Sequence, residues 1–150
     1  MDSLGVKYEY EPEAYELEDG VVYLPDFWVP SLETFLEIKP DKPKPHEEHK
    51  ALLLAKQSMR RVIVLTGNPV LPTNDLHGGY IYFPSGNADE YYWWCECPKC
   101  GAFGIEWGGS SHKLKCSHLT GGYQNFNSGR LITAYDKSAR HRFWNLPPIR

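Results

Sequence analysis

Residues 34–65 contain two β-prone runs with a helical pattern between them. Thr34–Lys39 is a β-prone run in which Leu36 and Ile38 share one face and Phe35, Glu37 and Lys39 the other, and Val62–Leu65 is a continuous apolar run, typical of a buried strand. The apolar residues that recur at helical spacing between His46 and Arg61 are Leu52, Ala55 and Met59. A strand, a helix and a strand in this order predict a parallel crossover inside a mixed sheet.

A β-hairpin is predicted upstream of the crossover. Ala14–Leu17 and Val21–Leu24 are short β-prone segments, and Glu18-Asp19-Gly20 between them is a turn signal. Val6–Tyr10 is a further β-prone stretch. Together with the crossover, these segments predict an α/β (α+β) fold in which antiparallel strands continue into a mixed sheet.

Two carboxylates and a lysine follow the predicted hairpin in the sequence. Asp26 follows it, and Glu37 and Lys39 lie two residues apart on one face of the next predicted strand. Carboxylates hold a hard cation such as Mg²⁺ (or Mn²⁺), and an ammonium offsets charge on a phosphate. We expect the oxygens of Asp26 and Glu37 within about 5 Å of a common point, bordered by the Ile38 carbonyl as a further ligand and by the Lys39 ammonium.

These segments resemble a known family. Tyr8–Glu13, Tyr23–Trp28 and Glu37-Ile38-Lys39, with the helix and buried strand that follow, resemble the core of the PD-(D/E)XK nuclease superfamily over about residues 4–66. More narrowly, they are similar to short nuclease-like proteins of phages and prophages. The resemblance implies a restriction-endonuclease-like core, metal binding by Asp26 and Glu37, a catalytic Lys39, and hydrolysis of DNA as an Mg²⁺-dependent endonuclease.

In that family a helix with a further acidic residue usually precedes the first strand, and Met1–Gly5 corresponds to only its end. Three alternatives follow: the fold does without this helix, another chain supplies it, or Glu9, Glu11 or Glu13 substitutes for its acid. A missing helix would leave an apolar face of the sheet uncovered. We therefore expect a homodimer or a partner protein that covers this face.

A cysteine cluster lies in the second half of the chain. Cys97-Pro98-Lys99-Cys100-Gly101 has the spacing at which two thiolates bind one tetrahedral metal ion, and two further ligands follow in a Cys-x-His pair. The predicted ligands of a structural zinc ion are Cys97, Cys100, Cys116 and His118. Cys95 or His112 could take the place of His118 as the fourth ligand.

The chain is predicted to divide near residue 70. Residues 1–70 form the nuclease-like core, and residues 71–150 form an aromatic-rich, zinc-ribbon-like segment packed on that core as one unit. Strands are predicted at Tyr80–Phe83 and Tyr91–Trp94. An amphipathic C-terminal helix is predicted from about Ser128 to Phe143.

The net charge of −3 gives no overall signal for nucleic-acid binding, but the charge is unevenly distributed. Residues 1–37 contain ten Asp/Glu and one Lys, whereas residues 38–61 contain seven Lys/Arg and three acids. The candidate phosphate-binding residues are Lys56, Arg60, Lys137, Arg140 and Arg142. No apolar run approaches the roughly 20 residues that a membrane span requires, and a cytoplasmic location, in a bacterial cell or a phage-infected host, is expected.

Two other functions compete with the nuclease. A catalytically degenerate protein could keep the nuclease fold and only bind nucleic acid, or the zinc-binding segment could serve protein interaction. The complete set of Asp26, Glu37 and Lys39 favours the enzyme, because an inactive copy has no need of all three residues.

Overall fold

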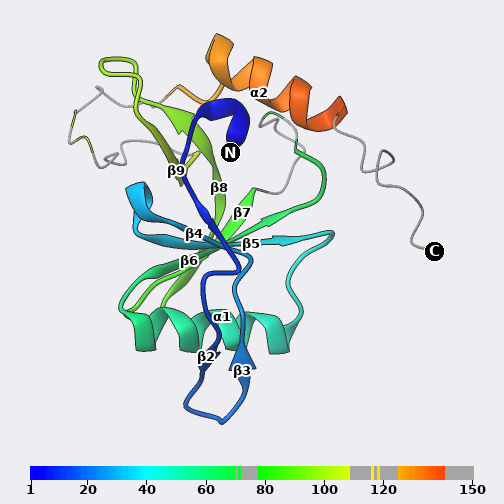
Figure 1. Cartoon of the computed structure of the whole chain (residues 1–150), viewed down its shortest axis with the longest axis vertical. Helices are drawn as coiled ribbons and strands as arrows, with labels where there is room; N and C mark the ends of the chain where they lie inside the picture. The colour runs from blue at the N-terminus through cyan, green and yellow to red at the C-terminus, as the bar shows by residue number, and fades with distance from the viewer. Residues whose placement is uncertain (70, 72–77, 109–115, 117, 119–124, 141–150) are drawn as a thin grey trace.

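The structure, a computed structural model, describes residues 1–69, 71, 78–108, 116, 118 and 125–140. Within them, seven strands form one mixed sheet in the order β1-β4-β5-β6-β7-β8-β9, and β2 and β3 form a separate two-stranded ribbon (Figure 1). The strands are β1 (Glu9–Tyr10), β2 (Tyr15–Glu16), β3 (Val22–Tyr23), β4 (Phe27–Val29), β5 (Thr34–Lys39), β6 (Arg61–Thr66), β7 (Gly79–Tyr82), β8 (Ala88–Glu96) and β9 (Phe103–Trp107). The helices are the 3₁₀ helices η1 (Asp2–Leu4) and η2 (Pro30–Leu32) and the α-helices α1 (Pro45–Ser58) and α2 (Gly129–Arg140).

The predicted crossover is confirmed. Strands β5 and β6 are parallel neighbours, paired from Thr34↔Arg61 to Lys39↔Thr66, and α1 connects them. Pro45 occupies the first turn of α1, where the fixed φ of proline suits a helix and its missing N–H costs nothing. Met59 ends the helix in the left-handed region, with a φ of 55°.

The predicted core face of α1 is confirmed at Ala55 and, as a partly buried side chain, at Leu52, and it is wrong at Met59. Ala51, Leu54 and Ala55 are buried, whereas Met59 is 70% exposed. The helical pattern was extended one turn too far, because α1 ends at Ser58 and the left-handed Met59 no longer follows the helical period. The core side of α1 is therefore set by Ala51 and Leu54 together with Ala55.

The hairpin prediction is confirmed for β2 and β3, which pair antiparallel around Glu18-Asp19-Gly20. Gly20 has a φ of 77°, a left-handed conformation that glycine adopts without steric cost. The earlier segment, β1, pairs instead with β4. The hairpin thus projects from the sheet as a ribbon, and its second strand leads directly into Asp26.

The second half of the chain continues the same sheet. Strand β8 contains the predicted segment Tyr91–Trp94, and β7 covers Tyr80–Tyr82 of the predicted Tyr80–Phe83. Strand β9, which the sequence does not predict, pairs with β8 along Tyr92–Glu96. The parts of the chain on both sides of residue 70 therefore share one sheet, while their division into two units stays a prediction. The confirmed fold is a mixed α and β structure with a large mixed sheet.

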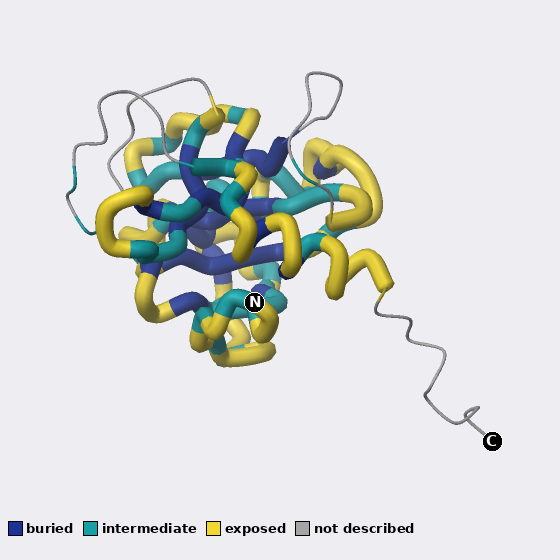
Figure 2. The backbone as a smooth tube through the Cα atoms, turned by 90° about the horizontal axis from the view of Figure 1, so that it is seen from above, coloured by how far each residue is buried: buried dark blue, intermediate teal, exposed yellow. Residues whose placement is uncertain are grey.

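Helices cover both faces of the sheet. Helix α1 covers one face, over a cluster that includes Phe35, Val62 and Val64, and α2 packs on the other with η1 beside it (Figure 1). Leu131 and Ala134 of α2 are 0% and 7% exposed. The tube view shows buried strands in the interior and exposed turns around them (Figure 2). The apolar face from which we expected a homodimer or partner protein is thus occupied by α2 and η1, and such association stays a prediction.

In the part of the chain that the structure describes, neither helix has the length and apolar character that a membrane span requires.

Candidate active site and metal centre

Neighbouring strands bring Asp26 and Glu37 together. Strands β4 and β5 are antiparallel, with Phe27 opposite Leu36, so that Asp26, one residue before Phe27, lies across from Glu37. Pro25, which precedes Asp26, is fully buried and fixes the entry into β4. Asp26 and Glu37, eleven residues apart in sequence, are therefore neighbours in space because β4 and β5 pair.

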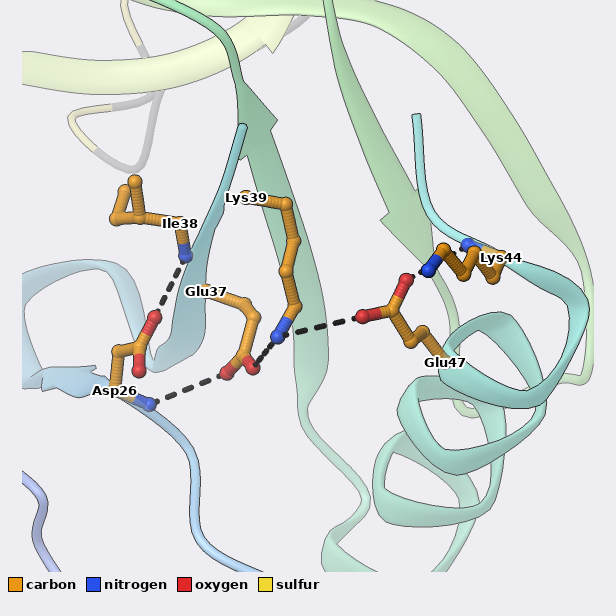
Figure 3. A network of polar contacts seen from close by, with 6 residues as sticks. All are labelled: Asp26, Glu37, Ile38, Lys39, Lys44 and Glu47. Carbon is orange, nitrogen blue, oxygen red and sulfur yellow. Dashed lines mark hydrogen bonds and ion pairs between the residues drawn. The ribbon is translucent and has the colours of Figure 1, made fainter. Parts of the chain in front are cut away.

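Hydrogen bonds join the two acids and the lysine into one network (Figure 3). The backbone N–H of Asp26 donates to Glu37 Oε2 at 3.2 Å, and the backbone N–H of Ile38 donates to Asp26 Oδ2 at 2.8 Å. Lys39 Nζ forms an ion pair with Glu37 Oε1 at 2.9 Å. Asp26, Glu37 and Lys39 are thus brought together, and the expected convergence of the Asp26 and Glu37 carboxylates on one cation stays a prediction.

The site is partly shielded from water. Glu37 is only 4% exposed, and Tyr23 of β3 forms a hydrogen bond with its carboxylate. Burial and the charge of Glu37 raise the pKa of Tyr23 far above its usual value, so that the hydroxyl keeps its proton. Burial opposes the charged form of Lys39, but the hydrogen bond to Glu37 and the charges of Glu47 and Asp26 raise its pKa.

Sequence reasoning missed a third carboxylate beside the site, that of Glu47 on α1. Its Oε1 lies 3.7 Å from Lys39 Nζ, and its Oε2 accepts the backbone N–H of Lys44 at 2.8 Å (Figure 3). The N–H of Glu47 in turn donates to the carbonyl of Lys44. This reciprocal pair is a helix cap with the spacing N-cap-x-x-Glu, a signal that was present in the sequence.

A cavity of about 100 Å³ opens at this network. It is bounded by β3, β5 and β6 on the sheet side and by the start of α1 on the other. Its lining residues are Tyr23, Glu37, Lys39, Pro43, His46, Glu47, Lys50 and Val64. The cavity therefore joins the acid–lysine network to two basic side chains of α1, His46 and Lys50, which sequence reasoning also missed.

The donor set of this network suits a hard divalent cation. Asp26 and Glu37 offer carboxylate oxygens, the ligands that Mg²⁺ and Mn²⁺ prefer. The structure connects Ile38 to Asp26 through its N–H, and the role of its carbonyl as a ligand stays a prediction. Glu9, Glu11 and Glu13, the candidate substitutes for the acid of a leading helix, are exposed side chains.

The predicted zinc ligands converge. One ligand atom each from Cys97, Cys100, Cys116 and His118 lies within 4.8 Å of the other three. Ligands 2.0–2.3 Å from a tetrahedral zinc ion are roughly 3.3–3.8 Å apart, so small adjustments suffice to bind the ion. Gly101, with a φ of 71°, closes the knuckle by donating its N–H to the carbonyl of Cys97. This Cys₃His cluster could hold a metal such as zinc.

The environment of Cys97 favours its thiolate. Burial opposes ionisation, but the backbone N–H groups of Cys100 and Lys99 and the side chain of His118 lower the pKa of Cys97 to about 6. His118 Nδ1 lies 3.4 Å from Cys97 Sγ. Cys95, one candidate for the fourth ligand, is buried with its Sγ 3.6 Å from the carbonyl of Gly104 and is not part of the cluster. His112, the other, lies outside the described residues.

Of the basic residues predicted to bind nucleic acid, the four that the structure describes do not line the cavity. Lys56 lies nine residues beyond Glu47 on α1, about 13 Å along the helix axis. Arg60 forms an ion pair with Glu33 at 3.2 Å. Lys137 and Arg140 are exposed at the end of α2, which packs on the opposite face of the sheet from α1, and Arg142 lies outside the described residues.

Comparison with protein-family models, curated proteins and solved structures finds no match to this chain.

Proposed function

We propose that this chain is a divalent-cation-dependent nuclease of the PD-(D/E)XK type that hydrolyses phosphodiester bonds of DNA. One observation carries the proposal: Asp26, Glu37 and Lys39 form a single hydrogen-bonded network, of which Glu37 and Lys39 line a cavity. A structural ion pair on a strand would explain Glu37 with Lys39. It would not explain why Asp26, next to the neighbouring strand β4, donates its backbone N–H to the Glu37 carboxylate while its own carboxylate accepts the N–H of Ile38.

Each residue has a distinct task in this proposal. Asp26 and Glu37 hold the cation, which when bound polarises the phosphate and acidifies a water molecule. Lys39 places its positive charge next to the scissile phosphate, where it offsets the negative charge that develops in the transition state. Water adds to phosphorus and gives up one proton, one P–O ester bond breaks, and the leaving oxygen takes up one proton. Glu37 is 4% exposed, so its carboxylate is itself shielded from bulk water, which strengthens its attraction for a cation.

The direct test is incubation of the purified protein with single-stranded, duplex and branched DNA, with Mg²⁺ or Mn²⁺ and with EDTA. We expect cleavage of at least one substrate that depends on the cation. Parallel reactions with RNA of the same sequences decide the class of nucleic acid. DNA binding without cleavage under any cation would favour the catalytically degenerate protein instead.

The distribution of charge indicates the side from which DNA reaches the site. Glu13, Glu16 and Glu18, in or next to the β2–β3 ribbon, are exposed acids. The ribbon also contacts α1, where Asp19 Oδ2 lies 3.3 Å from His49 Nε2, whereas His46 and Lys50 line the cavity. Phosphates are attracted to the basic side chains that line the cavity and repelled from the acids of the ribbon. The DNA strand is therefore proposed to pass along the first half of α1.

Replacement of Lys50 by glutamine should weaken DNA binding by about three- to tenfold, and the dependence of log Kd on log salt should fall by about one unit of slope. Lys56→Gln is the matched control, because it removes the same charge from the same helix at a distance from the cavity. Fluorescence anisotropy with labelled DNA in the presence of Ca²⁺ measures both the affinity for DNA and its dependence on salt. Equal effects of the two substitutions would place the DNA elsewhere.

A further inference from the structure

Lys39 lies between two carboxylates, and only one of them belongs to the proposed cation site. Its Nζ is 2.9 Å from Glu37 Oε1 and 3.7 Å from Glu47 Oε1 (Figure 3). The Lys39 and Glu47 side chains are 28% and 27% exposed, whereas that of Glu37 is 5% exposed. The ammonium therefore has a buried partner nearby and a more exposed one slightly farther away.

The Glu47 carboxylate is held in place by its own helix. Because Oε2 accepts the N–H of Lys44 at 2.8 Å, the carboxylate forms part of the cap of α1 and its orientation is fixed. Its other oxygen, Oε1, faces Lys39. The start of α1 thus presents a fixed negative charge to Lys39, whether or not Glu37 binds a cation.

A divalent cation and the Lys39 ammonium compete for Glu37. The Glu37 carboxylate already accepts the N–H of Asp26 at Oε2 and the ammonium at Oε1. A cation bound by Asp26 and Glu37 would draw on the same carboxylate and would repel an ammonium in contact with it. Repulsion from a bound cation therefore favours movement of Lys39 away from Glu37, and a second anion nearby keeps the lysine at the site.

We propose that Glu47 is a positioning residue that keeps the Lys39 ammonium at the site when a divalent cation occupies Asp26 and Glu37. The inference rests on the proposed function, because it assumes that cation. In this arrangement the ammonium moves from Glu37 toward Glu47 Oε1. It remains on the wall of the cavity, beside the position proposed for the phosphate.

The test substitution is Glu47→Gln. Glutamine can still accept the N–H of Lys44, so the cap is kept while the charge that receives Lys39 is lost. Calorimetric titration of the DNA-free protein with Mg²⁺ should show about a three- to fivefold weaker affinity, the size expected for losing one partly exposed ion pair. Glu48→Gln, the next position on α1, is the control for the loss of one carboxylate and should leave the affinity within twofold.

A double-mutant cycle separates positioning from a general effect of charge. If Glu47 acts through Lys39, Glu47→Gln should not change Mg²⁺ affinity in a Lys39→Ala background. An equal loss in both backgrounds, or no loss in either, would overturn the proposal. Thermal unfolding should show Glu47→Gln as stable as the wild type, and Glu47→Ala as less stable because the cap is removed.

Cleavage kinetics give the second readout. Glu47→Gln should lower kcat at saturating Mg²⁺ while KM for DNA stays unchanged, because the substitution displaces a group that acts in the transition state. The titration needs no DNA, so the two proposals fail separately. A protein that shows the coupling but cleaves nothing contradicts the nuclease and supports the role of Glu47. A protein that cleaves DNA but shows no coupling between Glu47 and Lys39 supports the nuclease and contradicts the role of Glu47. A protein that binds no divalent cation contradicts both the nuclease and the role of Glu47.

Discussion

Replacement of Asp26 by asparagine should lower the rate of DNA cleavage by more than about 100-fold without unfolding the protein. The amide has nearly the shape of the carboxylate, and its oxygen can still accept the N–H of Ile38, which now donates to Asp26 Oδ2 at 2.8 Å. What disappears is the negative charge that holds the cation. Gel assays of cleavage and a thermal melt of the same preparation measure the two effects.

Asp41→Asn is the matched control for this substitution. Asp41 is an exposed acid two residues beyond Lys39, so its replacement changes the net charge by the same amount near the same end of β5. We expect Asp41→Asn to cleave DNA at a rate within about twofold of the wild type, as for a typical surface substitution. Cleavage by Asp26→Asn at the wild-type rate would mean that the reaction takes place elsewhere.

Lys39→Ala provides a complementary expectation at the same site. Loss of the Lys39 side chain should reduce turnover strongly while Mg²⁺ still binds, because Lys39 acts on the phosphate and not as a cation ligand. Removal of the ammonium also frees Glu37 Oε1, to which it is bound at 2.9 Å. A calorimetric titration should therefore show Mg²⁺ affinity equal to or higher than that of the wild type.

The crossover could be predicted because its signals are local. The alternation in β5 and the apolar run of β6 each have their own period, and proline at the start of α1 limits where the helix begins. Strand β9 could not be predicted in the same way. Phe103–Trp107 lies in the segment that the sequence describes only as aromatic-rich and zinc-ribbon-like, and only pairing with β8 makes it a strand.

The difference between local sequence patterns and contacts between separate segments also explains which parts of the candidate site could be predicted. Glu37 and Lys39 share a face because a strand has a period of two, and Asp26 joins them through the pairing of adjacent strands. Glu47 and Lys50 reach the site through the way α1 lies across the sheet. That arrangement depends on the packing of Ala51 and Leu54 against the sheet, which no local pattern specifies.

Protein purified without added metal should contain about one zinc ion per chain, and Cys100→Ser should contain none. Cys100 is exposed, so replacing its sulfur with oxygen costs little packing, and any loss of stability reports the metal. Cys95→Ala is the control: Cys95 is fully buried but lies outside the cluster. It should lose some stability through packing and keep its zinc, as measured by elemental analysis and thermal unfolding.

Loss of zinc should also loosen α2, because side chains connect the knuckle to the start of that helix. Arg130 donates to the carbonyl of Gly101 at 3.1 Å and to Glu96 at 2.9 Å, and Ser128 donates to the same Glu96 carboxylate. When the knuckle is no longer held by metal, the Gly101 carbonyl loses its fixed position and the anchor of α2 weakens. Hydrogen exchange of Cys100→Ser should therefore be faster in α2 and unchanged in α1, and equal acceleration in both helices would contradict this coupling.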